Sequence, residues 1–143
     1  MGDPTPRRGE LAAGWLSVAA GAIHGGVAQQ HFEEWWGYGA FFVAAGLCQT
    51  LFGLLLLTHG IESPRLGWER ARRPLLVAGI VGNLAILALW LVTRTVGIPW
   101  FGPEAGRVEP VGATDAASKM VEMVLVTLLF LLWRAPPAVK HKA

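Results

Sequence analysis

Two histidines and a glutamate share one face of the first long apolar segment. His24 and His31 are seven residues apart, which places them about 20° apart around a helix of 3.6 residues per turn. Glu34 stays near that face if the helix continues. Imidazole and carboxylate suit a divalent metal such as zinc, or a proton relay. Because the rings would stand roughly 10 Å apart along the axis, one ion would not readily take both. The alternative is a core histidine bonded to a neighbouring helix and an interfacial histidine.

A second set of ionisable residues opens the last apolar segment. Asp115, Lys119 and Glu122 follow i, i+4, i+7 spacing and share a stripe within about 60°. Lys119 can pair with Asp115 one turn before it or with Glu122 one turn after it. Glu122 is the deeper carboxylate, and ionisable groups at such depth usually face a bundle interior or a water-filled cavity. The alternative is an ion pair that neutralises itself for packing, with Lys119 extended toward the interface.

Gln49, Asn83 and Arg94 extend these two sets into a polar seam. Each alone is typical of hydrogen bonding between helices. Together they lead to the hypothesis that His24 and Glu122 face each other, which a distance beyond hydrogen-bond or single-water reach would contradict. The candidate residues of a ligand or proton site are His24, His31, Glu34, Glu109, Asp115, Lys119 and Glu122. The metal candidates among them are His24, His31 and Glu34, and the identity of any cofactor stays open.

A long connection, about residues 94–115, precedes the last apolar segment. It mixes aromatic residues with proline and glycine and carries Glu104, Arg107 and Glu109. Loops of this length without secondary structure are more often functional than idle. We expect it to fold over the outer mouth of the bundle as a lid or a cap.

Four apolar segments position these residues. The chain has 143 residues, of which 53% are hydrophobic and 15% charged, against roughly 25% charged in a soluble domain. Crossing a hydrocarbon core takes roughly 20 mostly apolar residues as helix. Segments of about that length span residues 11–30, 39–58, 75–93 and 116–133. They must be helices because lipid cannot satisfy their backbone groups. The sequence therefore predicts an all-α, four-helix transmembrane bundle, with residues 1–143 forming a single membrane domain.

The first segment is rich in glycine and alanine, among them Gly14, Gly21, Gly25 and Gly26. Small residues let transmembrane helices approach closely, since lipid is as apolar as leucine and packing drives association. We expect this helix to lie centrally in the bundle.

Lysine and arginine in the short connections predict the orientation. The first connection has neither residue, and the third has only Arg107, with Arg94 at its edge. The basic residues gather in the N-terminus, the second connection and the C-terminal tail: Arg7, Arg8, Arg65, Arg70, Arg72, Arg73, Arg134, Lys140 and Lys142. Both termini are therefore predicted to be cytoplasmic, in a multi-pass protein of the bacterial inner membrane.

Several familiar chemistries lack their motifs. The sequence has no glycine-rich phosphate loop, no Cys-x-x-Cys and no Gly-x-Ser-x-Gly. Haem is not expected, because His24 and His31 share one helix and cannot approach opposite faces of the ring. A net charge of +2 is too small to indicate nucleic acid. The expected partners are the lipid bilayer and either a second copy of the chain or other membrane subunits.

The run Glu33-Glu34-Trp35-Trp36-Gly37-Tyr38-Gly39 and the residues from Gly106 to Val111 resemble those of uncharacterised small four-span membrane proteins of bacteria. The overall plan is also similar to that of DoxX-like four-helix proteins. The resemblance implies the same architecture and carries no activity or catalytic residues.

Three classes of function are compatible with these features. The first is an ionisable site in the outer half that binds or relays a cation, a proton or a small polar ligand. The second is an accessory or structural subunit of a larger membrane complex. The third, a membrane redox enzyme, is the least supported because the sequence shows no nucleophile or cofactor motif.

Overall fold

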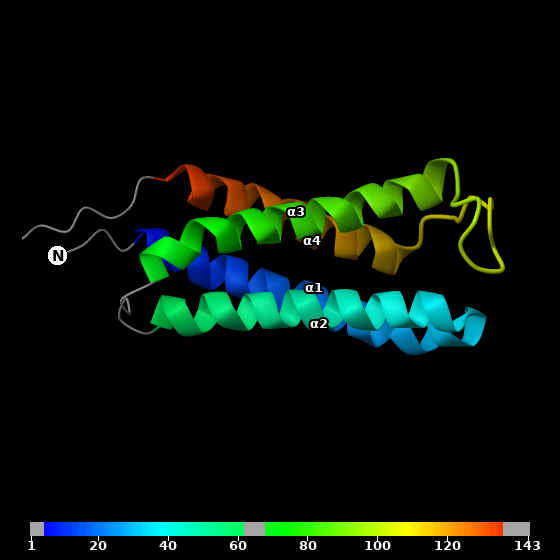
Figure 1. Ribbon diagram of the computed structural model, residues 1–143, viewed down its shortest axis with the longest axis horizontal. Coiled ribbons are helices and arrows are strands. Elements are labelled where there is room, and N and C mark those ends of the chain that lie inside the picture. The colour runs from blue at the N-terminus through cyan, green and yellow to red at the C-terminus, as the bar shows by residue number, and fades with distance from the viewer. Residues whose placement is uncertain (1–4, 62–67, 136–143) are drawn as a thin grey trace, which may run out of the picture.

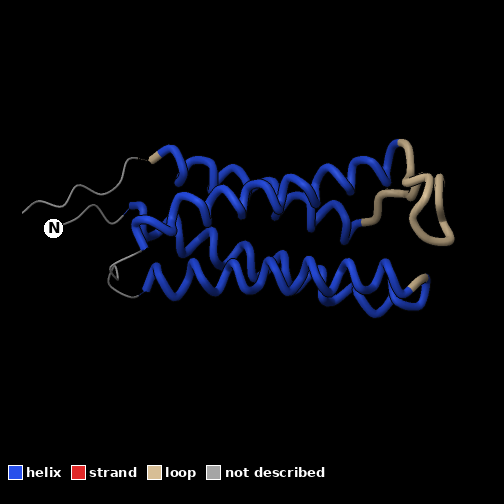
Figure 2. The backbone as a smooth tube through the Cα atoms, viewed as in Figure 1, coloured by secondary structure: helices blue, strands red, loops and turns tan. Residues whose placement is uncertain are grey.

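The computed structural model describes residues 5–61 and 68–135, which form four α-helices and no strand (Figures 1 and 2). The helices are α1 (Thr5–Glu34), α2 (Trp36–Ile61), α3 (Trp68–Thr95) and α4 (Ala113–Arg134). Each contains its predicted segment and extends beyond it. The longest extension at a single end is that of α3, whose start at Trp68 leaves Pro74 inside the helix. The prediction of an all-α, four-helix bundle is confirmed.

All four helices are long and apolar enough to cross a membrane. The spans are Arg8–Glu34, Trp36–Thr58, Arg70–Thr95 and Ala113–Arg134. Large apolar side chains such as Leu51, Val81 and Leu131 are exposed on the outside of the bundle. In water such a surface would be an aggregation liability, whereas lipid solvates it. The chain is a multi-pass membrane protein.

The two ends of the bundle differ. At one end, here called the loop end, lie the short α1–α2 turn at Trp35 and the loop of residues 96–112 (Figure 1). At the other, here called the terminal end, lie the start of α1 and the end of α4. Which end faces the cytoplasm stays a prediction. It draws in part on Arg65, Lys140 and Lys142, which lie outside the described residues.

The helices form a ring in which each borders two others, since α1 packs on α2 and α4 while α3 packs on α4 and α2. Among the described helices α1 packs most extensively and its span is the most buried, although it borders two neighbours as the others do. Its close approach to α2 rests on glycines. A Cβ added to Gly53 would lie 2.6 Å from the carbonyl oxygen of Gly14, and one added to Gly21 would lie 2.7 Å from that of Gly46.

The two halves of the interior are also unlike. An apolar cluster fills the terminal half, where Leu56, Leu76, Leu125 and Leu129 are fully or almost fully buried against one another. Below it, at the terminal end, the guanidinium of Arg72 donates to the carboxylate of the buried Glu10 at 2.5 Å. The buried polar residues of α1, α2, α3 and α4 other than this pair lie toward the loop end of the cluster.

Candidate functional site

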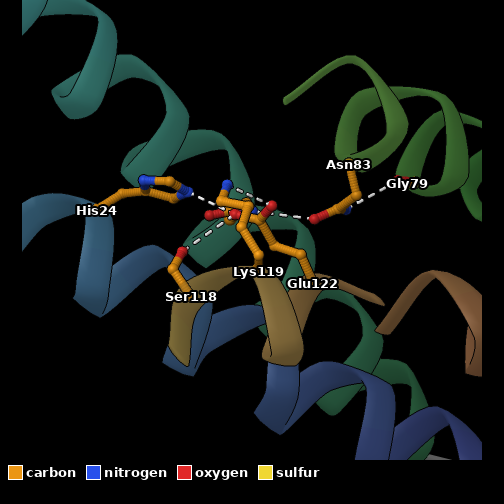
Figure 3. Close-up of polar contacts among 7 residues, drawn as sticks. His24, Gly79, Asn83, Ser118, Lys119 and Glu122 are labelled. Atoms are coloured by element: carbon orange, nitrogen blue, oxygen red, sulfur yellow. Dashed lines mark hydrogen bonds and ion pairs between the residues drawn. The ribbon is translucent and has the colours of Figure 1, made fainter. Parts of the chain in front are cut away.

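The fully buried carboxylate of Glu122 is the centre of the polar half (Figure 3). One of its oxygens lies 2.8 Å from Nε2 of His24 and also accepts a 3.3 Å hydrogen bond from Ser118. The other accepts from the ammonium of Lys119 at 2.6 Å. His24 and Glu122 therefore meet, as hypothesised from the sequence. Of the two partners open to Lys119, the structure selects Glu122. These four residues are called the Glu122 cluster below.

The helix geometry explains why these residues meet. His24 lies ten residues before the last residue of α1, and Glu122 lies nine residues after the first residue of α4. At 1.5 Å per residue, both are about 15 Å from the loop end, on neighbouring helices that run in opposite directions. Lys119 and Ser118 lie one turn before Glu122, so their side chains reach its carboxylate.

The hydrogen bonds also define which ring nitrogen of His24 carries the proton that faces Glu122. A carboxylate that is paired with an ammonium is ionised and can only accept hydrogen bonds. His24 must therefore donate from Nε2, while Figure 3 shows its other ring nitrogen directed away from Glu122. In the neutral imidazole that second nitrogen is an acceptor. Lys119 and Glu122 cancel each other's charge, so this pair adds no net charge to the cluster.

A cavity of about 1110 Å³ opens beside the cluster at the loop end. His24, Ser118 and Lys119 line it, and Glu122 lies behind them. Its walls include aromatic side chains of α2 and α3, such as Phe41, Phe42 and Trp90. The predicted site residues that line it are His24, His31, Glu34, Glu109, Asp115 and Lys119, together with Arg94 of the predicted seam.

The metal hypothesis receives no support from this geometry. His31 bonds through Nδ1 to the carbonyl oxygen of Val27 at 2.8 Å, and its ring packs on Phe42 with centroids 3.9 Å apart. The ring of Phe42 also lies beside that of His24, with their centroids 5.6 Å apart. Glu34 is exposed. Among the described residues, no three histidine, cysteine or acidic side chains gather as a ligand set.

The roof of the cavity is the loop of residues 96–112. The hydroxyl of Tyr38 donates to the carbonyl oxygen of Phe101 at 3.1 Å, and the rings of Trp35 and Phe101 meet edge to face at 4.9 Å. Gly97, Gly102 and Gly106 adopt positive φ angles of 71°, 79° and 79°, which side chains rarely tolerate. The loop therefore has a defined path over the loop end, in agreement with the expected cap.

Arg94 holds this roof to the helices. Its guanidinium pairs with Glu109 of the loop and, at 2.7 Å, with Asp115 in the first turn of α4. Asp115 also accepts from the backbone N–H of Gly112 at 3.2 Å, which satisfies an otherwise free donor at the start of the helix. Asp115 and Glu109 thus attach the roof to the helices through Arg94, and neither belongs to the Glu122 cluster.

Replacing Arg94 by glutamine is expected to loosen the roof. The variant leaves both carboxylates without their shared guanidinium, so backbone amide exchange across residues 96–112 should rise by about tenfold, which corresponds to about 1.4 kcal/mol. Hydrogen exchange read by mass spectrometry measures this. The matched control is Arg107→Gln, because Arg107 pairs with Glu104 on the exposed surface of the same loop. Equal exchange in the two variants would contradict the assignment of Arg94.

The predicted polar seam is present in part. Nε2 of Gln49 donates to Oδ1 of Asn83 at 3.0 Å, and Asn83 donates to the carbonyl oxygen of Gly79 at 2.8 Å. Ser17 bonds to the backbone oxygen of Gln49 at 2.7 Å. These bonds join α1, α2 and α3 near the depth of Glu122, as interhelical hydrogen bonds do. Arg94 is not part of this seam.

Sequence reasoning missed the pair at the terminal end. Arg72 also donates to the backbone oxygen of Leu132 at 3.2 Å, so this guanidinium links α3 to both α1 and α4. The sequence pattern uses Arg72 only to predict orientation and does not indicate Glu10 as its partner. A charged residue at the very start of an apolar segment was the signal available, but it does not reveal a partner 62 positions away.

In comparisons with family models, curated proteins and solved structures, nothing matched this chain. The resemblance to DoxX-like proteins stays a prediction. A function has to be argued from the site itself.

Proposed function

We propose that this membrane protein binds a small ligand in the loop-end cavity, with His24 and Lys119 as its polar contacts. The observation that carries the proposal is the Glu122 cluster, a buried set of ionisable groups at the floor of a large cavity. Binding sites are typically mostly apolar cavities with a few convergent polar groups.

The energetic cost of the cluster supports a functional role. A charged side chain within a membrane helix costs about 2.5–3.5 kcal/mol on insertion scales. Well-packed apolar residues often replace a buried ion pair with no loss of stability. A chain that retains Lys119, Glu122 and His24 in contact at this depth therefore has a use for them beyond packing.

Binding is better supported than conduction. Leu125 and Leu129 lie one and two turns beyond Glu122 on α4 and are fully buried in the apolar cluster. A conduction path toward the terminal end would have to cross this apolar cluster, where the hydroxyl of Ser17 is the only buried polar side chain described between the Gln49–Asn83 bond and the pair of Glu10 and Arg72. The cavity is thus a site that the apolar cluster closes toward the terminal end of the bundle.

For the cellular location we propose the bacterial inner membrane, with the loop end outside. The described basic residues support this orientation, since Arg8, Arg70, Arg73 and Arg134 belong to the terminal end. The positive-inside tendency places such residues in the cytoplasm.

A panel of six probes tests the proposal: an alcohol, a carboxylate and an alkylamine, each in a short-chain and a medium-chain form. In lipid nanodiscs, at least one probe should raise the Tm of the wild-type protein in a saturable way, because a ligand at a hundred times its Kd stabilises by about 2.7 kcal/mol. The His24→Leu variant should lose this response.

Thr127→Val is the matched control, because the Thr127 hydroxyl is exposed on α4 and bonds only to the Met123 carbonyl oxygen of its own helix. This variant should respond as the wild type does. The proposal is wrong if no probe raises the Tm of the wild type, or if His24→Leu responds equally.

The role of an accessory subunit is a second candidate. A Cβ added to Gly25 or Gly26 would meet nothing within 4 Å, and both glycines are exposed on α1. A surface of small residues lets another helix approach closely. Co-purification of a second membrane protein at fixed stoichiometry, lost in Gly26→Leu, would favour this role.

A further inference from the structure

The helices α2 and α3 make few contacts with each other, and they diverge toward the loop end (Figure 1). They are joined by the hydrogen bond from Gln49 to Asn83 and by the ring of Phe52, which packs directly on Gly79. The other neighbouring pairs pack more extensively, and α1 and α4 are linked at the cavity itself by His24 and Glu122. At the height of the cavity, the least closely packed pair of neighbouring helices is therefore α2 and α3.

The cavity borders both helices of this pair. On α2 it is lined by Tyr38, Phe41 and Phe42, and on α3 by Ile86, Leu89 and Trp90, among other residues. The surrounding surface of both helices is apolar and exposed, as Val43 and Leu91 show. An opening between two such helices faces the hydrocarbon of the bilayer rather than water.

The route along the bundle axis is covered instead. The roof is attached to the start of α2 through Tyr38 and Phe101, and to the end of α3 through Arg94 and Glu109. The contacts that would close the lipid-facing side are sparsest between α2 and α3, whereas the roof covers the aqueous end. A molecule that enters between these helices must dissolve in the bilayer.

The charges around the cavity limit the headgroup. At the floor, Lys119 and Glu122 cancel, so neither an anion nor a cation finds a free counter-charge there. At the rim, Arg94 is outnumbered by acidic residues, namely Glu34, Glu104, Glu109 and Asp115. Burying an unpaired charge is unfavourable, whereas a hydroxyl or carbonyl oxygen can accept from the spare N–H groups of Lys119. A hydroxyl can in addition donate to the second ring nitrogen of a neutral His24.

We propose that the ligand is an uncharged amphiphile with a hydroxyl or carbonyl headgroup, and that it enters the cavity from the bilayer between α2 and α3. This inference rests on the proposed function, since it names the ligand class and the entry route of the same site. The apolar body lies against the aromatic walls, and the headgroup reaches His24 and Lys119.

The test uses Trp90 as a reporter, because bromine quenches tryptophan fluorescence on contact and Trp90 lines the cavity. Trp90 is kept as the sole tryptophan by replacing the others with phenylalanine, and the protein is placed in vesicles. The probes are a monoglyceride, a fatty acid and an alkylamine, each brominated at mid-chain. Quenching by the monoglyceride should saturate and be reversed by its unbrominated form, with the charged probes binding about tenfold more weakly.

Two controls accompany this measurement. A protein with Trp133 as its sole tryptophan, exposed at the terminal end, should show quenching that neither saturates nor reverses. If either single-tryptophan protein fails to fold, Trp90→Phe in the otherwise native chain replaces it. The reversible part of the quenching should then fall, and what is left comes from Trp100, which also lines the cavity. Glu109→Gln, which loosens the roof, should leave the association rate unchanged within about twofold, since the route does not pass the roof.

The outcomes separate the two proposals. If a charged probe, or only a short-chain probe of the earlier panel, gives the tight and reversible binding, the cavity is a ligand site but the amphiphile is wrong. An association rate that rises about tenfold in Glu109→Gln would overturn entry between α2 and α3. If no probe of either set binds reversibly, the proposed function itself fails.

Discussion

Replacing Glu122 by glutamine is expected to lower the free energy of unfolding by about 3–5 kcal/mol, the range seen when one partner of a buried ion pair is removed. The amide matches the carboxylate in shape, so the change leaves no void. It does leave the ammonium of Lys119, which is 9% exposed, without its counter-charge. Unfolding by a denaturing detergent in mixed micelles measures the difference.

Two further variants show whether the loss arises from the unpaired charge. Replacing both Lys119 and Glu122 by methionine should recover most of the stability, to within about 1–2 kcal/mol of the wild type, because only the bonds of His24 and Ser118 then stay unmade. Glu104→Gln is the control, since it breaks an ion pair in which Arg107 is 72% exposed, and such pairs contribute about 0–1 kcal/mol. A Glu122→Gln variant as stable as Glu104→Gln would contradict the buried cluster.

The architecture was predictable because lipid imposes a simple requirement on the sequence. Twenty or so apolar residues must form a helix, and the four segments meet this condition without ambiguity. The ends were harder to predict, since α3 begins at Trp68 among charged residues that hydropathy treats as a connection. The ring arrangement depends on pairwise packing that composition does not encode, although the small residues of α1 did indicate the helix that packs most extensively.

Part of the site was predictable from depth alone. His24 and Glu122 lie at similar distances from the loop end of neighbouring helices, and both must avoid lipid, so their contact could be inferred. The partner of Asp115 could not, because Lys119 lies one turn along the same helix and only the packing of α3 on α4 brings Arg94 to the carboxylate. The packing of both His24 and His31 on the ring of Phe42 could not be predicted either, since it depends on how α2 is rotated against α1.

Replacing Gly21 by valine is expected to destabilise the bundle by about 3 kcal/mol, at the upper end of the range for overpacked sites. A Cβ at this position would lie 2.7 Å from the carbonyl oxygen of Gly46 and 2.9 Å from the backbone nitrogen of Thr50. Backbone atoms cannot rotate away as a side chain does, so α1 and α2 must move apart. The movement would also open their second close approach, at Gly14 and Gly53.

Gly26→Val is the matched control, because it makes the same change on the same helix where a Cβ meets nothing within 4 Å. It should leave the free energy of unfolding within about 0.5 kcal/mol of the wild type. The consequence of Gly21→Val should extend to the site, since His24 lies one turn farther along α1 and bonds to Glu122 at 2.8 Å. A shift of α1 by even 1 Å, roughly what overpacking requires, takes that bond beyond normal length. Saturable Trp90 quenching should therefore weaken in Gly21→Val and persist in Gly26→Val, and equal behaviour of the two would show that the α1–α2 contact does not position His24.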